Sequence, residues 1–239
     1  MKQYEQVINV MEKNGGYATL GFLNHTVNVS NWKTKTPYAS IRRIVQNKKI
    51  FFKIKPGLWA LKEFENIVLE KFKIKEYNTN EEKNIFTHSY YQGLIVEIGK
   101  IKGYITYIPP QDKNKLFLEK PLLNIVNTTE IFNFSYNEII KRARSIDVIW
   151  FNERNMPFSF FEVEYSTDIQ NSLLKFDDLQ DFYTEFYIVS SKVRKREFES
   201  KLNRNAFKKI KNRVKFIDYE FISRLHTKSI ELQKVGDYL

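Results

Sequence analysis

The 239-residue sequence contains no cysteine. This absence excludes disulfide frameworks, thiol catalysis and zinc or iron–sulfur sites with cysteine ligands, and it fits any redox compartment. No apolar run approaches the roughly 20 residues that a membrane-spanning helix needs. The N-terminal stretch MKQYEQVINV is interrupted by polar residues, unlike a signal peptide. We therefore expect a cytoplasmic protein.

Motifs of several common enzyme classes are also missing. The sequence has no GxxxxGK[ST], GxGxxG or GxSxG, which removes the usual sequence support for an NTPase, a dinucleotide-binding protein or a serine hydrolase. The histidines His25, His88 and His226 are scattered without the spacing of metal ligands, so we interpret them as structural.

Apolar residues and positive charge are abundant. Hydrophobic residues make up 42% of the chain and aromatic residues 15%, enough for a substantial core. The formal net charge is +11, of which residues 1–65 carry +7 and residues 192–215 carry +9, leaving −5 for the rest. Two basic blocks around a mildly acidic body favour a nucleic-acid-binding protein with a carboxylate-containing site. The alternative for residues 192–215 is a solvated basic helix.

The first 65 residues have the pattern of a winged helix-turn-helix. Apolar spacing predicts a helix around residues 4–11, which Asn14-Gly15-Gly16 ends through positive φ angles. A second helix is expected over residues 19–25 and a third over residues 37–48, with Pro37 at its first position. The stretch IFFKIKPGLWALK predicts a hairpin that turns around Lys55-Pro56-Gly57.

The third helix of such a module fits the major groove of DNA, where arginine and glutamine contact base edges. We expect DNA contacts from the segment before the third helix, from that helix itself and from the hairpin. The residues are Lys33, Lys35, Ser40, Arg42, Arg43, Gln46, Lys53 and Lys55. The segments GGYATLGFLN, WKTKTPYASIRRIVQ and FFKIKPGLWAL resemble the HARE-HTH group of winged helices, which occur attached to bacterial restriction enzymes. This resemblance covers about a quarter of the chain. A winged helix used for protein contacts, or as a cap on the other domain, is the alternative.

A boundary near residue 80 separates this predicted domain, residues 1–80 with a linker, from a second domain over residues 81–239. The second part alternates between helical and strand patterns. Strand patterns include SIDVIWF, MPFSFFEVEYS, FYIVS and VKFIDYE, and a basic helix is expected over residues 194–211. This alternation predicts an α/β fold, α+β overall, in which helices flank a mixed central sheet.

Three carboxylates lie in the predicted strands. Glu162 and Glu164 are two residues apart, so on a strand both point to one face while Val163 points to the other. Buried carboxylates are costly unless a cation or hydrogen bonds compensate them. Mg²⁺ suits such oxygen ligands and can activate water for phosphodiester hydrolysis. Salt bridges to the basic blocks, or an exposed strand face, are the alternatives.

Asp147, followed after fourteen residues by Glu162-Val163-Glu164, resembles the motif of the PD-(D/E)XK nuclease fold. The resemblance covers roughly residues 84–220 and implies that Asp147 and Glu162 are metal ligands, with Glu97 as the additional helix carboxylate. Glu164 stands where the motif has lysine. Either Glu164 orients or deprotonates the attacking water, or Lys175 from the following helix supplies the amine.

These features together predict a Mg²⁺-dependent, sequence-specific endonuclease of the restriction type, which cuts double-stranded DNA. Cutting both strands of a palindromic site requires two active sites, so we expect a two-fold symmetric homodimer. A non-catalytic DNA-binding regulator is one alternative, and a methylation-dependent or repair nuclease is another.

Overall fold

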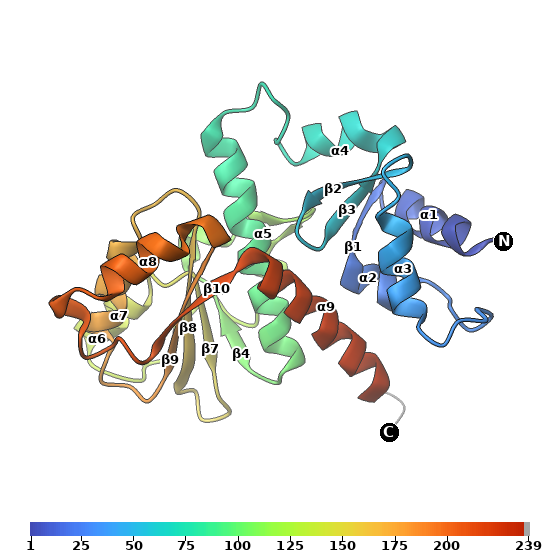
Figure 1. Cartoon of the computed structure of the whole chain (residues 1–239). Coiled ribbons are helices and arrows are strands. Elements are labelled where there is room, and N and C mark those ends of the chain that lie inside the picture. The colour runs from blue at the N-terminus through green and yellow to red at the C-terminus, as the bar shows by residue number, and fades with distance from the viewer. Residues whose placement is uncertain (237–239) are drawn as a thin grey trace. The chain divides into compact units, whose positions relative to one another are not determined.

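The computed structural model describes residues 1–236 and divides the chain into two compact units (Figure 1). The N-terminal unit contains residues 1–78 together with the C-terminal segment from Ser223 onward, and the sheet unit contains Thr79–Ile222. The segment from Ser223 thus joins the first unit, whereas the sequence pattern placed it in the second. Over the described residues, no helix is both long enough and apolar enough to cross a membrane.

The N-terminal unit combines short helices with a small antiparallel sheet, in the strand order β1-β3-β2. Its elements are α1 (Gln3–Lys13), β1 (Tyr17–Thr19), α2 (Leu20–Thr26), α3 (Pro37–Val45), β2 (Phe51–Lys55), β3 (Leu58–Leu61), the 3₁₀ helix η1 (Lys62–Phe64) and α4 (Glu65–Lys71). Its core gathers apolar residues from α1, α2, α3 and the sheet. The last helix of the chain, α9 (Tyr219–Gly236), contributes its residues from Ser223 onward.

Local chemistry explains these elements. Gly15 and Gly16 have φ angles of 77° and 87°, which confirms the predicted end of the first helix. The Thr19 side chain caps α2 by accepting a hydrogen bond from the Phe22 backbone nitrogen at 3.1 Å. The third helix ends at Val45, three residues earlier than predicted. Strand β1 was not predicted, because three residues are too few to show an alternating pattern.

The sheet unit is built around a five-stranded sheet in the order β10-β9-β8-β7-β4. Its helices and strands are α5 (Asn80–Ile101), β4 (Ile105–Tyr107), β5 (Leu116–Phe117), β6 (Lys120–Pro121), α6 (Asn137–Ala143), β7 (Val148–Phe151), β8 (Pro157–Glu164), α7 (Ile169–Asp178), β9 (Glu185–Ser190), α8 (Lys195–Leu202) and β10 (Val214–Asp218). Four 3₁₀ helices connect them: η2 (Pro110–Asp112), η3 (Leu122–Asn124), η4 (Lys192–Arg194) and η5 (Asn205–Phe207). Strands β8, β9 and β10 are parallel, and β7 and β4 are antiparallel to their neighbours. The predicted mixed sheet is confirmed.

Helices cover both faces of this sheet. On one face, Phe160 and Phe186 pack with Phe176 of α7 in a fully buried core. On the other face, Trp150 donates a hydrogen bond from Nε1 to the Ile95 carbonyl of α5 at 3.2 Å. Side chains of one strand alternate between the faces, so residues next to each other on β8 contact different helices.

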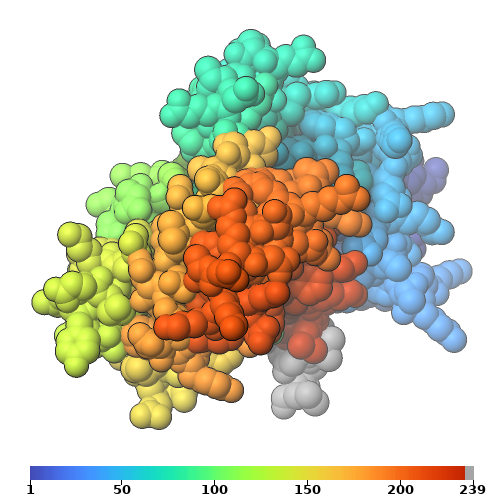
Figure 2. Space-filling view, turned by 60° about the vertical axis from the view of Figure 1, so that its left-hand side comes forward, coloured from blue at the N-terminus to red at the C-terminus, as the bar shows by residue number. Residues whose placement is uncertain are grey.

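The basic segment 192–215 does not contain the single helix over residues 194–211 that the sequence pattern predicts. It contains η4, α8, η5 and the first residues of β10, and α8 ends at Leu202 with Asn203 as its C-cap. Phe207 is buried in the sheet core after this break. The chain leaves the helix here because Val214 has to pair with Phe186 at the edge of the sheet. Figure 2 shows this segment in orange, gathered on the face turned toward the viewer.

Gly93 of α5 provides a test of how tightly this unit is packed. A Cβ atom at this position would lie 2.2 Å from the ring of Phe117, closer than packed atoms can approach. We expect Gly93→Ala to lower the free energy of unfolding by about 1–3 kcal/mol through overpacking. This loss exceeds the gain of roughly 1 kcal/mol in helix propensity. Denaturant unfolding measures the difference.

The matched control makes the same exchange in a Phe117→Ala background. Without the ring the added methyl group has space, so Gly93→Ala is expected to be neutral or stabilising there. Equal destabilisation in both backgrounds would contradict this explanation.

Candidate active site

Two glutamates of β8 lie side by side under α7. Glu162 and Glu164 are 3% and 4% exposed, and the hydroxyl of Ser172 lies within hydrogen-bond distance of both carboxyls, 2.9 Å from Glu162 Oε2. These contacts confirm that the two side chains point to the same face of the sheet. Burial raises the pKa of both carboxyls. Since one hydroxyl has one proton to donate, the arrangement favours a proton on one of the two carboxyls.

Lys175 of α7 is the cation next to these carboxylates. Its Nζ lies 3.0 Å from Glu162 Oε1 and 2.9 Å from Glu162 Oε2, and it also donates to the Ser145 carbonyl at 3.0 Å. Helix α7 begins directly after β8 and is capped by the Asp168 side chain. Ser172 and Lys175 are three residues apart on it, so both face Glu162. The structure therefore brings the lysine that the sequence offered as an alternative amine into contact with the predicted ligand Glu162.

Asp147 lies at the edge of the same group. It immediately precedes β7, rather than lying within the strand, and the β7–β8 register pairs Val148 with Phe161. Extending this register by one residue places Asp147 opposite Glu162. Asp147 Oδ2 accepts a hydrogen bond from the Val163 backbone nitrogen at 2.7 Å. The neighbouring Asp147 carboxylate adds to the effect of burial in raising the pKa of Glu162.

His88 of α5 faces Asp147 from the other side. Its Nε2 lies 3.5 Å from Asp147 Oδ1 and 3.6 Å from Asp112 Oδ2, while its Nδ1 lies 3.2 Å from the Val163 carbonyl oxygen. Burial lowers the pKa of His88, but the two carboxylates outweigh burial and the net direction is upward. The structure thus places this histidine in the site, although its position in the sequence gave no sign of it.

Asp112 completes this group from the 3₁₀ helix η2. It is 3% exposed, and its carboxylate accepts hydrogen bonds from Gln92 at 2.8 Å and from Lys115 at 2.6 Å. Burial by itself would raise the pKa of Asp112. The neighbouring His88, together with the hydrogen bonds from Lys115 and Gln92, lowers it to about 2. Asp112 is therefore an anion at neutral pH despite its burial.

One ligand atom from each of His88, Asp112 and Asp147 lies within 4.8 Å of the other two. Two carboxylate oxygens and an imidazole nitrogen form a donor set that binds divalent cations. The buried His88 Nε2 has no hydrogen-bond partner among the described residues, so this nitrogen is available to bind a metal ion. Asp147 belongs both to this group and to the group with Glu162.

Glu97, the predicted helix ligand, lies elsewhere on α5. It comes nine residues after His88, or about two and a half helical turns, so the two side chains leave the helix on opposite sides. Among the described residues, the group of metal-binding side chains contains His88 and not Glu97. The helix residue that faces Asp147 in the structure is a histidine.

Most of the side chains predicted to contact DNA lie on the surface of the N-terminal unit. Lys33, Lys35, Arg42, Arg43, Gln46 and Lys53 are exposed, and Lys55 is half-buried, which lowers its pKa. Ser40 is the exception, because it is buried and its hydroxyl donates back to the Thr36 carbonyl of the preceding turn. A buried serine that bonds its own helix is not available for a base edge, so the structure does not support this predicted contact.

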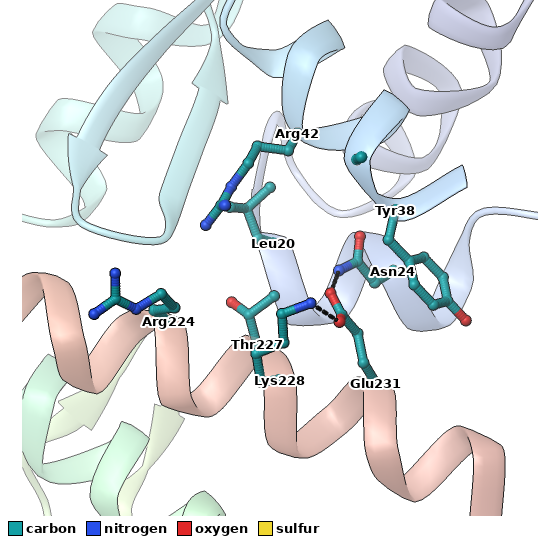
Figure 3. Close-up of a pocket in the computed structure, with 9 residues that line it drawn as sticks. Leu20, Asn24, Tyr38, Arg42, Arg224, Thr227, Lys228 and Glu231 are labelled. Carbon is teal, nitrogen blue, oxygen red and sulfur yellow. Dashed lines mark hydrogen bonds and ion pairs between the residues drawn. The ribbon is translucent and has the colours of Figure 1, made fainter. Parts of the chain in front are cut away.

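A groove of about 150 Å³ lies beside these residues, between α2, α3 and the C-terminal helix α9 (Figure 3). Arg42 extends into it from α3, and Arg224 and Lys228 extend from α9. Asn24 of α2 donates a hydrogen bond to Glu231 at 2.8 Å, and this contact fastens α9 to the unit. The sequence did not predict Arg224 and Lys228 for this surface, because they follow Arg42 by 182 and 186 residues.

Comparison with protein families gives a match over residues 67–237, more than two thirds of the chain. The matched description is of a type II restriction enzyme, and the chain is thus a restriction-enzyme-like nuclease. It belongs to the family of the type II restriction enzyme NmeDI C-terminal domain. No curated protein and no solved structure matches the chain.

Proposed function

We propose that this protein is a Mg²⁺-dependent, sequence-specific endonuclease that hydrolyses double-stranded DNA, with the sheet unit as its nuclease domain. The observation that carries the proposal is the joint presence of Asp147, Glu162 and Lys175 at the junction of β7, β8 and α7. Two carboxylates on neighbouring strands and an amine beside them are the groups that a PD-(D/E)XK nuclease uses, and here the amine comes from α7. Family membership supports the same reaction class.

Each of these residues has a physical role in such a reaction. A divalent ion held by Asp147 and Glu162 would stabilise the charge that develops on the phosphate and would lower the pKa of a bound water. Asp147 is fixed for this role by the Val163 backbone nitrogen. Lys175 is positioned to donate a hydrogen bond to the attacking water or to a phosphate oxygen, and it neutralises Glu162 meanwhile. The attacking water would form the new P–O bond as the bond to the leaving oxygen breaks, releasing one proton to solvent while the leaving oxygen takes one from solvent.

Plasmid DNA tests this proposal directly. We expect purified protein to convert supercoiled plasmid into a discrete set of fragments with Mg²⁺ and to leave it intact in EDTA. Discrete fragments indicate sequence-specific cutting, whereas a smear indicates a non-specific nuclease. Intact plasmid with Mg²⁺ would contradict the proposal and favour a non-catalytic DNA-binding protein. Methylated plasmid in a parallel reaction identifies dependence on base modification.

The N-terminal unit is our proposed DNA-reading module, a winged helix in which α3 enters the major groove and the β2–β3 hairpin contacts phosphates. The exposed Arg42 and Arg43 on α3 support this assignment. We expect the protein to act in the cytoplasm as a two-fold symmetric homodimer, because cutting both strands of a palindromic site requires two active sites. Light scattering on the complex with DNA is expected to give the mass of the DNA plus twice the mass of the 28.7 kDa chain.

The exposed lysines after α8 form the second proposed phosphate contact. Lys208, Lys209 and Lys211 are exposed, and no described carboxylate forms an ion pair with them. We expect their joint replacement by glutamine to weaken binding to all DNA sequences alike. The slope of log affinity against log salt should fall by about 1 for each phosphate that the protein no longer neutralises. Fluorescence anisotropy at several salt concentrations measures both quantities.

The matched control replaces Lys102, Lys120 and Lys141 by glutamine, three exposed lysines of the same unit outside the basic segment. This variant has the same net charge as the first. Equal weakening by both variants would show that overall charge matters and that the segment has no particular role.

A further inference from the structure

The carboxylates of Asp147 and Asp112, the two potential metal ligands beside His88, are each fixed by hydrogen bonds to other residues. Each directs one oxygen toward His88. Asp147 uses Oδ2 for the Val163 backbone nitrogen and presents Oδ1 to His88. Asp112 uses Oδ1 for Lys115, and its Oδ2, which accepts one hydrogen bond from Gln92, faces His88 with its second lone pair available. Such outer contacts are typical of metal-binding carboxylates, which need a fixed direction before the ion binds.

The protonation of His88 follows from its other contact. Nδ1 lies 3.2 Å from the Val163 carbonyl oxygen, which can only accept a hydrogen bond. Nδ1 therefore carries the proton, and in the neutral ring Nε2 has a free lone pair. This nitrogen is buried, has no hydrogen-bond partner in the described part of the chain, and lies between two carboxylates. A proton or a metal ion on Nε2 can balance the two neighbouring carboxylates, and the metal titration below distinguishes these two states.

We propose that His88, Asp112 and Asp147 form a metal-binding site that prefers first-row transition ions such as Co²⁺, Mn²⁺ or Zn²⁺ over Mg²⁺. The role of the bound ion in catalysis rests on the proposed nuclease function, while the binding itself does not. Imidazole nitrogen suits transition ions. Mg²⁺ prefers oxygen ligands and keeps several waters, so it gains little from the His88 nitrogen.

Gln92 connects the two aspartates of this site. Its fully buried Nε2 donates to Asp112 Oδ2 at 2.8 Å and to the Asp147 backbone carbonyl at 2.7 Å. Gln92 and His88 are four residues apart on α5, so they lie on the same side of the helix. We expect Gln92→Leu to weaken metal binding by about 10-fold, because outer-shell partners typically contribute that much.

The test measures metal binding without DNA. The full chain is first freed of metal with EDTA and dialysed, then titrated separately with Co²⁺, Zn²⁺, Mn²⁺ and Mg²⁺. Visible absorption of Co²⁺ and the shift in melting temperature report binding. We expect Co²⁺ and Zn²⁺ to bind at least about 10-fold more tightly than Mg²⁺. Tighter binding of Mg²⁺ would overturn the proposal.

The decisive variant is His88→Asn. The asparagine amide can replace Nδ1 as donor to the Val163 carbonyl, so the fold is retained while the ligand nitrogen is lost. We expect Co²⁺ affinity to fall at least about 10-fold and its absorption bands to change. His25→Asn, at an exposed histidine of the other unit, is the matched control and is expected to bind like the unaltered chain. Unchanged Co²⁺ binding by His88→Asn would show that His88 only forms ion pairs with the aspartates.

Metal binding and DNA cleavage can fail independently. Plasmid cleavage with Mg²⁺ but no Co²⁺ binding that depends on His88 would overturn this inference and leave the proposed function intact. Co²⁺ binding that depends on His88, in a protein that cuts no plasmid with any of the four ions, would support the site and contradict the nuclease proposal.

Discussion

Replacing Asp147 by asparagine is expected to reduce DNA cleavage by about 10³-fold or more while leaving DNA binding unchanged. The loss follows from the several kcal/mol of charge stabilisation that a metal ligand supplies to the transition state. Asparagine keeps an oxygen that can accept the hydrogen bond from the Val163 backbone nitrogen, so the strand end is preserved. Single-turnover cleavage and anisotropy binding measure the two effects separately.

Asp181→Asn is the matched control for this variant. Asp181 is exposed and lies in the same unit, in the turn that leads from α7 to β9, and its replacement removes the same charge. We expect the control to cleave at the normal rate. Full cleavage by Asp147→Asn, with its melting temperature unchanged, would exclude Asp147 from the active site and with it the catalytic metal position that it shares with Glu162.

Strands β7, β8, β9 and β10 of the sheet unit were predictable because their residues alternate or form short apolar runs. The pattern FFEVE indicated that Glu162 and Glu164 share a face, and their common contact with Ser172 confirms it. Lys175 could be considered from sequence because it follows β8 closely and lies on a helix with a regular apolar side. These inferences depend only on neighbours along the chain, which local periodicity describes well.

His88 and Asp112 could not be found in this way. They lie 24 residues apart, on a long helix and in a short 3₁₀ turn, and Asp147 follows another 35 residues later. No fixed spacing links such positions, because the sheet and α5 bring them together only after folding. Glu97 was predicted from a resemblance, whereas the direction of its side chain depends on the rotation of α5 against the sheet, which a single sequence does not fix.

The basic segment shows a similar limit. Phe198, Leu202 and Ile210 fit a helical period, so a helix over residues 194–211 was a reasonable prediction. Tertiary structure overrides this pattern, because the chain has to return to the sheet edge and pair with β9. The turn exposes Lys208, Lys209 and Lys211 at one place. The proposed phosphate contact is therefore a loop surface rather than a helix face.

Substitutions of Lys175 and Glu164 distinguish two explanations for the absence of the motif lysine. Either Lys175 supplies the amine, or Glu164 activates the attacking water. We expect Lys175→Met to lower the single-turnover cleavage rate by about 10²–10³-fold, the usual effect of removing a donor that stabilises developing charge. Glu164→Gln is expected to lower it less than about 10-fold, because both Glu164 oxygens accept hydrogen bonds from Ser172 and Thr167 and glutamine can retain most of this pattern. The comparison thus assigns the catalytic amine to α7.

The free energy of unfolding has to be measured together with the cleavage rate, because Lys175→Met leaves Glu162 buried without its cation. Removing one partner of a buried ion pair typically costs about 3–5 kcal/mol, although protonation of Glu162, whose pKa burial already raises, relieves part of it. Lys175→Arg keeps the positive charge and is expected to restore stability more fully than activity, since the guanidinium places its donors differently. If Glu164→Gln lost the larger part of the activity, Glu164 would be the residue that activates water and Lys175 would serve the fold.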